Sequence, residues 1–224
     1  MDQLVKRIPI SLKLAGFSML LTILFGVGFG VLMAVRKDRL LDHVLGTFST
    51  AALSVPGFWI AIVLIFLFAE QWKLLPSSGI SGGSGFILPA VTLALPSIGV
   101  CARLTRSAIL DEIGRQYMTV ADAKGMSRRH AVVCHAFGNA LIPIITYLGN
   151  HMAGIIGGAS IVETIFAIPG IGSYAIAGVQ SKDYYVVQAY VLFSGCIYVL
   201  TNILIDLIYI ALDPKIRAGE AVES

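Results

Sequence analysis

The chain has 224 residues, of which 57% are hydrophobic and 13% are charged, and its mean hydropathy is +0.85. A soluble domain carries roughly a quarter charged residues, so this composition excludes an ordinary water-soluble fold and favours a membrane protein. The net charge of +3 is modest, and we expect no nucleic-acid partner. Cys101, Cys134 and Cys196 are far apart and form no CxxC pair, which favours small buried hydrophobic residues over a metal site or disulfide.

The apolar residues fall into runs of roughly 20 or more, the length that a helix needs to cross a bilayer. We therefore expect an all-α, polytopic membrane bundle of about five transmembrane helices. The expected spans are 10–35, 44–68, 86–104, 141–166 and 186–212. The first run is too long for the apolar region of a signal peptide, and no small-residue cleavage site follows it.

Glycines are frequent inside two of the expected spans. Gly26, Gly28 and Gly30 lie in the first span, and Gly154, Gly157 and Gly158 lie in the fourth. Small residues allow membrane helices to approach closely, so this pattern favours a packed bundle, although glycine is also simply tolerated in such helices.

One long polar stretch, residues 103–139, separates the third and fourth spans. Its basic residues exceed its acidic ones, which predicts a cytoplasmic loop by the positive-inside rule. Alternation then places residues 36–39 and the C-terminus inside, and loops 70–85 and 168–185 outside. Five spans would put the N-terminus outside as well, although Lys6, Arg7 and Lys13 resist translocation. An additional upstream span would remove this conflict, and the chain is therefore expected to be short at its front end.

Within this loop, residues 117–143 read YMTVADAKGMSRRHAVVCHAFGNALIP. Gly125 suits the C-terminal cap of one helix and Ser127 the N-terminal cap of the next. Small residues at 121, 123 and 125 would let such a helix sit deep in a partner's groove. A cytoplasmic helical hairpin without function explains the pattern about as well.

The stretch resembles the EAA loop of ABC importer permeases, with Thr119, Val120, Ala121 and Gly125 on that loop's frame. Its form AKG…H…NALIP resembles the dipeptide, oligopeptide and nickel branch. The triplet lacks the usual glutamate, and Gly138 stands where that branch often has a basic residue. Further resemblances follow in order: PISLKL and SVPGFW near the front, then IVETIFAIPGIG, DYYVVQ and LDPKIR.

The resemblance implies a single type I ABC importer transmembrane domain over 1–224 that lacks the usual N-terminal first span, with 103–139 as its coupling loop. It implies a multi-pass protein of a bacterial or archaeal plasma (inner) membrane, surrounded by lipid. The implied partners are two ATPase subunits, a second and different permease and an extracytoplasmic substrate-binding protein. No GxxxxGK[ST] phosphate loop is present, so ATP and magnesium belong to the ATPase, and we expect neither a cofactor nor an enzymatic activity in this chain. The residues expected to dock on the ATPase are Thr119, Val120, Ala121, Asp122, Ala123, Lys124, Gly125, Ser127, Arg128, Arg129 and His130.

Polar side chains at membrane depth suggest where a substrate passes. His151, Met152 and Glu163 are the candidate pathway residues, and imidazole beside thioether suits a late first-row metal, so His151 is a candidate metal ligand. A lone histidine bonded between helices and a glutamate with a helix-end role are the structural alternatives. The main interpretation is a permease for nickel or a nickel chelate; the alternatives are a di- or oligopeptide permease, or a truncated fragment that does not transport. A channel or secondary transporter is disfavoured because no internal repeat is found.

Overall fold

The computed structural model describes residues 2–80, 83–115 and 136–212, and every regular element in these ranges is helical. Three short elements, η1, η2 and η3, are π-helical or 3₁₀ turns that continue or precede α-helices. In chain order the elements are α1 (Asp2–Leu21), η1 (Thr22–Val27), α2 (Gly28–Val35), α3 (Leu40–Ser54), α4 (Gly57–Leu64), η2 (Ile65–Gln71), η3 (Gly83–Phe86), α5 (Ile87–Ile113), α8 (Phe137–Gly158), α9 (Ser160–Ile165), α10 (Ile171–Gln180) and α11 (Tyr184–Leu212).

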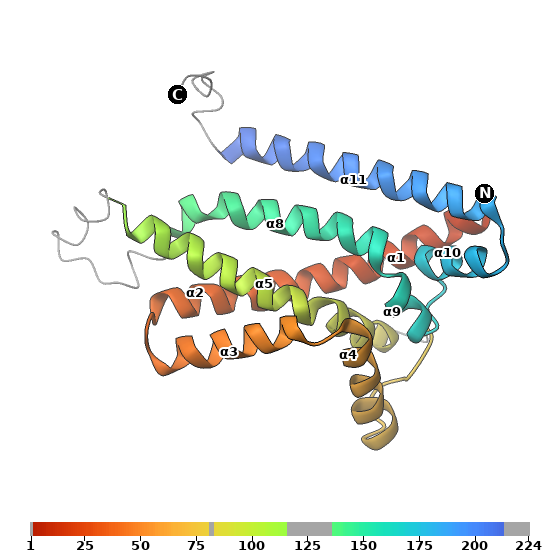
Figure 1. The fold of residues 1–224 in the computed structure, drawn as a ribbon, viewed down its shortest axis with the longest axis horizontal. Helices are drawn as coiled ribbons and strands as arrows, with labels where there is room; N and C mark the ends of the chain where they lie inside the picture. Colours follow the sequence, from red (N-terminus) through yellow and green to blue (C-terminus); the bar gives the residue numbers. More distant parts are fainter. Residues whose placement is uncertain (1, 81–82, 116–135, 213–224) are drawn as a thin grey trace.

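Helix α5 is the centre of the bundle (Figure 1). It packs against α1, α2, α3, α4 and α8, and α11 lies on the outer side of α8. The start of α1 lies at one end of the bundle, and the α2–α3 turn lies at the other end with the end of α5. The expectation of an all-α membrane bundle is confirmed, and helices α1 to α4 all pack on α5.

The first span is a single helical rod from α1 through η1 to α2. The helical stretch that is long and apolar enough to cross a membrane is Gln3–Val35, so the first span begins earlier than the expected residue 10. Lys6 and Arg7 therefore lie on the helix itself rather than before it, as Lys13 also does. Pro9 lies inside α1 and is exposed.

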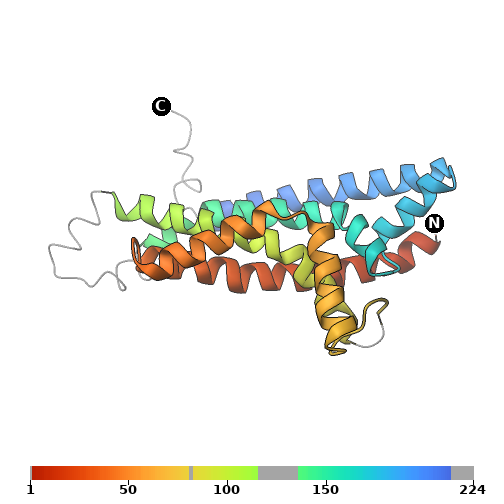
Figure 2. The ribbon, with the colours of Figure 1, turned by 60° about the horizontal axis from the view of Figure 1, so that its bottom comes forward.

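The second expected span, 44–68, is not one straight helix. Helix α3 ends at Ser54, and the chain turns by 102° before continuing through α4 and η2. The cause is Pro56, because proline disfavours helical geometry at the preceding residue, and Val55 is indeed extended with φ −92° and ψ 126°. The α4–η2 segment consequently projects sideways from the bundle (Figure 2).

Two other expected boundaries also shift. Helix α5 continues to Ile113, so residues 103–113 of the expected loop belong to a membrane helix that contains Pro96. The expected fourth span, 141–166, begins earlier, at Phe137, and is divided at Ala159 into α8 and the short α9.

Three helical stretches among the described residues are long and apolar enough to cross a membrane, or four if the bent α3–α4 pair counts as one. These stretches are 3–35, 83–113 and 184–208, with 40–71 as the bent pair. The expected count was about five, and α8 makes a further helix in the bundle, although Asn139, Asn150 and His151 lower its hydropathy.

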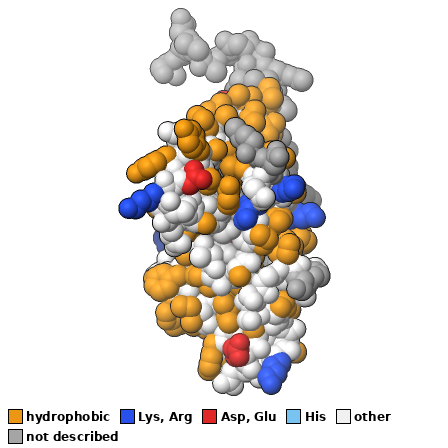
Figure 3. Space-filling model, turned by 90° about the vertical axis from the view of Figure 1, so that its right-hand side faces the viewer, with side chains coloured by type: hydrophobic (Ala, Val, Ile, Leu, Met, Phe, Trp, Pro, Cys, Tyr) orange, Lys and Arg blue, Asp and Glu red, His pale blue; other side chains and the backbone are white. Residues whose placement is uncertain are grey.

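Apolar side chains spread over the end face of the molecule shown in Figure 3, with scattered charges among them.

Glycines bring the first span close to α5. A Cβ on Gly26 would lie 2.7 Å from the Cβ of Cys101, and a Cβ on Gly30 would lie 2.7 Å from the carbonyl oxygen of Ala102. By contrast, Gly28 and Gly154 have no such neighbour within 4 Å. The prediction of close packing is therefore confirmed for Gly26 and Gly30, which are one helical turn apart on the same face.

Candidate functional site

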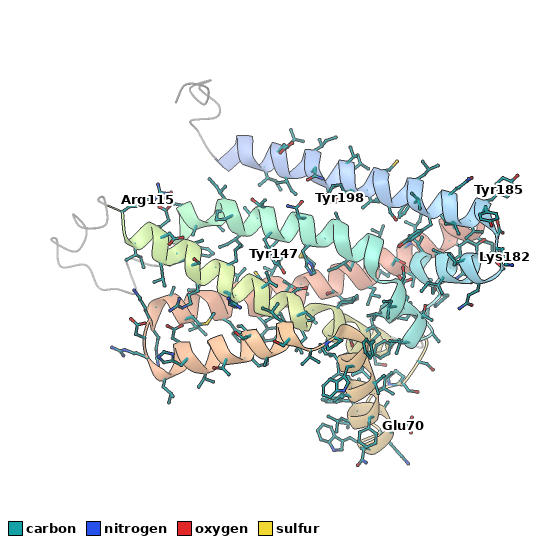
Figure 4. All side chains as sticks on the ribbon, viewed as in Figure 1. Glu70, Arg115, Tyr147, Lys182, Tyr185 and Tyr198 are labelled. Atoms are coloured by element: carbon teal, nitrogen blue, oxygen red, sulfur yellow. The ribbon has the colours of Figure 1, made fainter. Side chains whose placement is uncertain are left out.

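The predicted ATPase-docking residues, 119–125 and 127–130, lie outside the described residues. The described chain reaches Arg115, which Figure 4 shows at the end of α5. There, two residues beyond the end of α5, its Nη2 atom lies 3.0 Å from Oε1 of Glu112 in the last turn of that helix. The role of the docking residues therefore stays a prediction.

A polar cavity of about 790 Å³ lies between α3 and α5. Helix α3 contributes one polar face, with His43, Thr47, Thr50 and Ser54 spaced four, three and four residues apart, so that they lie on one side of the helix. Helix α5 contributes Arg103, Arg106 and Ser107. In a membrane, ionised side chains such as Arg103 and Arg106 face protein or water rather than lipid, so the cavity can accommodate a polar solute.

Asp42 and Arg106 join the two walls of this cavity. The Nε and Nη2 atoms of Arg106 donate to the two carboxylate oxygens of Asp42 at 2.7 and 2.8 Å. Asp42 is 5% exposed, and its Oδ2 also accepts a hydrogen bond from the backbone N–H of Asp38 at 2.9 Å. A bidentate pair with this geometry fixes the orientation of both side chains, so it holds the first turn of α3 against α5.

Arg103 lies one turn before Arg106 and is exposed in the cavity wall. Among the described residues it forms no ion pair, in contrast to Arg106. Since the charges of Asp42 and Arg106 cancel, Arg103 contributes a positive charge to the cavity wall that no described carboxylate pairs with.

His151 and Met152, two of the predicted pathway residues, lie on α8 away from this cavity. The imidazole stacks on Tyr147, with ring centroids 5.7 Å apart and planes 4° from parallel (Figure 4 labels Tyr147). Its Nε2 atom is buried without a hydrogen-bond partner. In the described ranges no group of three or more His, Cys, Asp or Glu side chains could hold a metal ion, so His151 is not part of such a group there. Its assignment as a metal ligand stays a prediction.

Glu163, the third predicted pathway residue, is 1% exposed near the start of α10. Its Oε1 accepts a hydrogen bond from Oγ of Ser11 at 2.6 Å, and its Oε2 accepts one from the backbone N–H of Ser173 at 2.9 Å. Ser11 Oγ in turn accepts from the backbone N–H of Ile171 at 2.9 Å. Together Ser11 and Glu163 satisfy N–H groups in the first turn of α10 and tie that helix to α1.

The sequence reasoning missed the α3 side of the cavity. The available signal was the spacing of His43, Thr47, Thr50 and Ser54 in an otherwise apolar segment, which places a polar stripe on one helix face. The Asp42–Arg106 pair had no comparable signal, because its members are 64 residues apart.

This helical bundle has the fold of the transmembrane domain of a type I ABC importer. The fold is found in two solved structures. One is the inward-facing MetNI methionine ABC transporter, with a TM-score of 0.79 at 17% identity, covering 95% of this chain and 97% of that one. The other is an amino acid ABC transporter with histidines, with a TM-score of 0.73 at 18% identity and 92% of each chain covered.

The chain belongs to the family of binding-protein-dependent transport system inner membrane components, whose family model matches residues 26–218. It is 39% identical over 220 residues to a probable peptide ABC transporter permease protein of Sinorhizobium fredii, y4tP, covering 95% of this chain and 70% of that protein. It is 35% identical to the dipeptide transport system permease protein DppB of Bacillus subtilis, with 96% and 70% covered. It is 34% identical to the probable D,D-dipeptide permease DdpB of Escherichia coli, with 94% and 71% covered.

The protein is therefore a permease subunit of an ABC importer in the bacterial inner membrane. It is not an enzyme, since ATP hydrolysis in this family belongs to a separate subunit, and the family implies an ATPase and a substrate-binding protein as partners. The interpretation as a nickel permease gains no support from these relatives, and the peptide alternative fits them better.

Proposed function

We propose that this chain is a permease subunit for the import of di- or oligopeptides. The observation that carries the proposal is its identity of 34 to 39% to three permeases named for peptides or dipeptides, over almost its whole length. The cavity between α3 and α5 agrees with such a substrate, because its volume of about 790 Å³ falls in the range of small-molecule sites, roughly 300–1,000 Å³.

The working assembly that we propose contains two ATPase subunits, a second permease of related sequence and an external binding protein. Residues 119–125 and 127–130 would contact the ATPase, and its closure on ATP would move the membrane helices as rigid bodies. The Asp42–Arg106 pair supports this proposal, since it couples α3 to the end of α5 from which the docking segment departs.

The test is uptake by the complete transporter in proteoliposomes that contain the binding protein outside and ATP inside. Labelled dialanine, a longer alanine peptide and nickel ions are supplied in separate experiments. We expect ATP-dependent accumulation of at least one peptide and none of nickel. Accumulation of nickel without peptide would overturn the proposal in favour of the metal interpretation, and an assembled complex that moves neither would favour a chain that does not transport.

A further inference from the structure

We propose that Arg103 binds the C-terminal carboxylate of a peptide while the peptide passes through the α3–α5 cavity. This inference rests on the proposed function, and it assigns a specific substrate contact to one side chain of the cavity wall. A terminal carboxylate is present in every unmodified peptide whatever its side chains, so one cation can serve substrates of differing sequence.

The charges of the cavity make Arg103 the available partner for an anion. Arg106 is committed to Asp42 by two hydrogen bonds, at 2.7 and 2.8 Å. Arg103, three residues earlier on α5, lines the same cavity, is exposed and has no ion-pair partner in the described ranges. A planar guanidinium in this position can offer two parallel N–H groups to a carboxylate.

The opposite wall can receive the rest of a peptide. Oγ1 of Thr50 donates to the carbonyl oxygen of Gly46 at 3.0 Å, and Oγ of Ser54 donates to the carbonyl oxygen of Thr50 at 2.9 Å. Because both protons are directed into the helix, the hydroxyl oxygens keep lone pairs for peptide N–H groups. Both residues line the cavity and are exposed.

Binding at such a site must be weak if transport is to continue. The cavity is open and Arg103 is exposed, so solvent reduces the strength of the pair. An exposed guanidinium therefore suits a transient contact better than Arg106, whose charge is already compensated.

The test measures the number of peptides moved per ATP hydrolysed, using the complete transporter in proteoliposomes with dialanine as the probe. In Arg103→Gln we expect this ratio to fall about tenfold while ATP hydrolysis stimulated by the binding protein is retained, because the loss concerns the substrate contact and not ATPase docking. Arg103→Lys keeps the charge and should recover most of the ratio.

The matched control is Lys37→Gln, which removes an exposed cation from the α2–α3 turn at the same end of the bundle, outside the cavity lining. It should leave the ratio unchanged. The inference is overturned if Arg103→Gln keeps the ratio of peptides moved per ATP hydrolysed, which includes the case in which transport and ATP hydrolysis fall in parallel. It is also overturned if Lys37→Gln shows the same loss as Arg103→Gln, because that result would indicate a contact of both cations with lipid phosphate. A wild-type complex that moves no peptide refutes the proposed function before any variant is compared.

Discussion

Replacing Glu163 by alanine should strongly destabilise the contact between α1 and α10. The carboxyl group accepts one hydrogen bond from Ser11 and one from the backbone of Ser173, and the side chain is 1% exposed. Leaving a buried donor unsatisfied costs about 1–3 kcal/mol, so loss of both partners should cost about 2–6 kcal/mol. For a chain of this size, each kcal/mol lowers the melting temperature by about 2–4 °C.

Glu163→Gln provides the informative comparison. Its amide oxygen can accept from the N–H of Ser173, and its NH₂ group can donate to Oγ of Ser11, so we expect a loss of about 1 kcal/mol. Glu70→Ala is the control for the alanine substitution, since Glu70 is exposed at the tip of the projecting α4–η2 segment (Figure 4) and should change stability by less than about 0.5 kcal/mol.

The assay is thermal unfolding of the purified transporter in detergent, followed by the fraction of this chain that remains in the monodisperse complex after heating. We expect the wild type and Glu70→Ala to have the highest melting temperatures, Glu163→Gln an intermediate one and Glu163→Ala the lowest. If Glu163→Ala melted together with Glu70→Ala, the hydrogen bonds of Glu163 would contribute nothing measurable and the reasoning would be refuted.

Three further predictions concern packing, the cavity and coupling. Gly30→Val should sharply lower the yield of folded protein in detergent, because its Cβ would press on the α5 backbone, while Gly28→Val at an open position should not. Asp42→Asn should lower transport and ATP hydrolysis together by several-fold, because Arg106 loses a charged partner; unchanged rates would contradict the proposed link between α3 and α5. Gly125→Asp should abolish co-purification of the ATPase through a tag on this chain, and retention of the ATPase would argue against residues 119–125 and 127–130 as the docking surface.

The sequence by itself determined the class of the protein and much of its order along the chain. The apolar runs predicted helices in a membrane, and the glycines of the first and fourth spans predicted close packing, which holds at Gly26 and Gly30 but not at Gly28 or Gly154. These signals are local: hydrophobicity over 20 residues and the absence of a side chain act through nearest neighbours and the lipid, so they can be read without knowing the fold. The succession of motifs through the chain likewise indicated the importer family.

Only the tertiary structure decided which polar groups meet. Asp42 and Arg106 are 64 residues apart, and Ser11 and Glu163 are 152 residues apart, yet each pair lies in hydrogen-bond contact. The 102° bend at Pro56 was also unforeseen, since proline is tolerated within α1 and α5 of the same bundle. Contacts of this kind depend on how helices cross, and the crossing is set by the summed packing of all helices around α5 rather than by any local pattern.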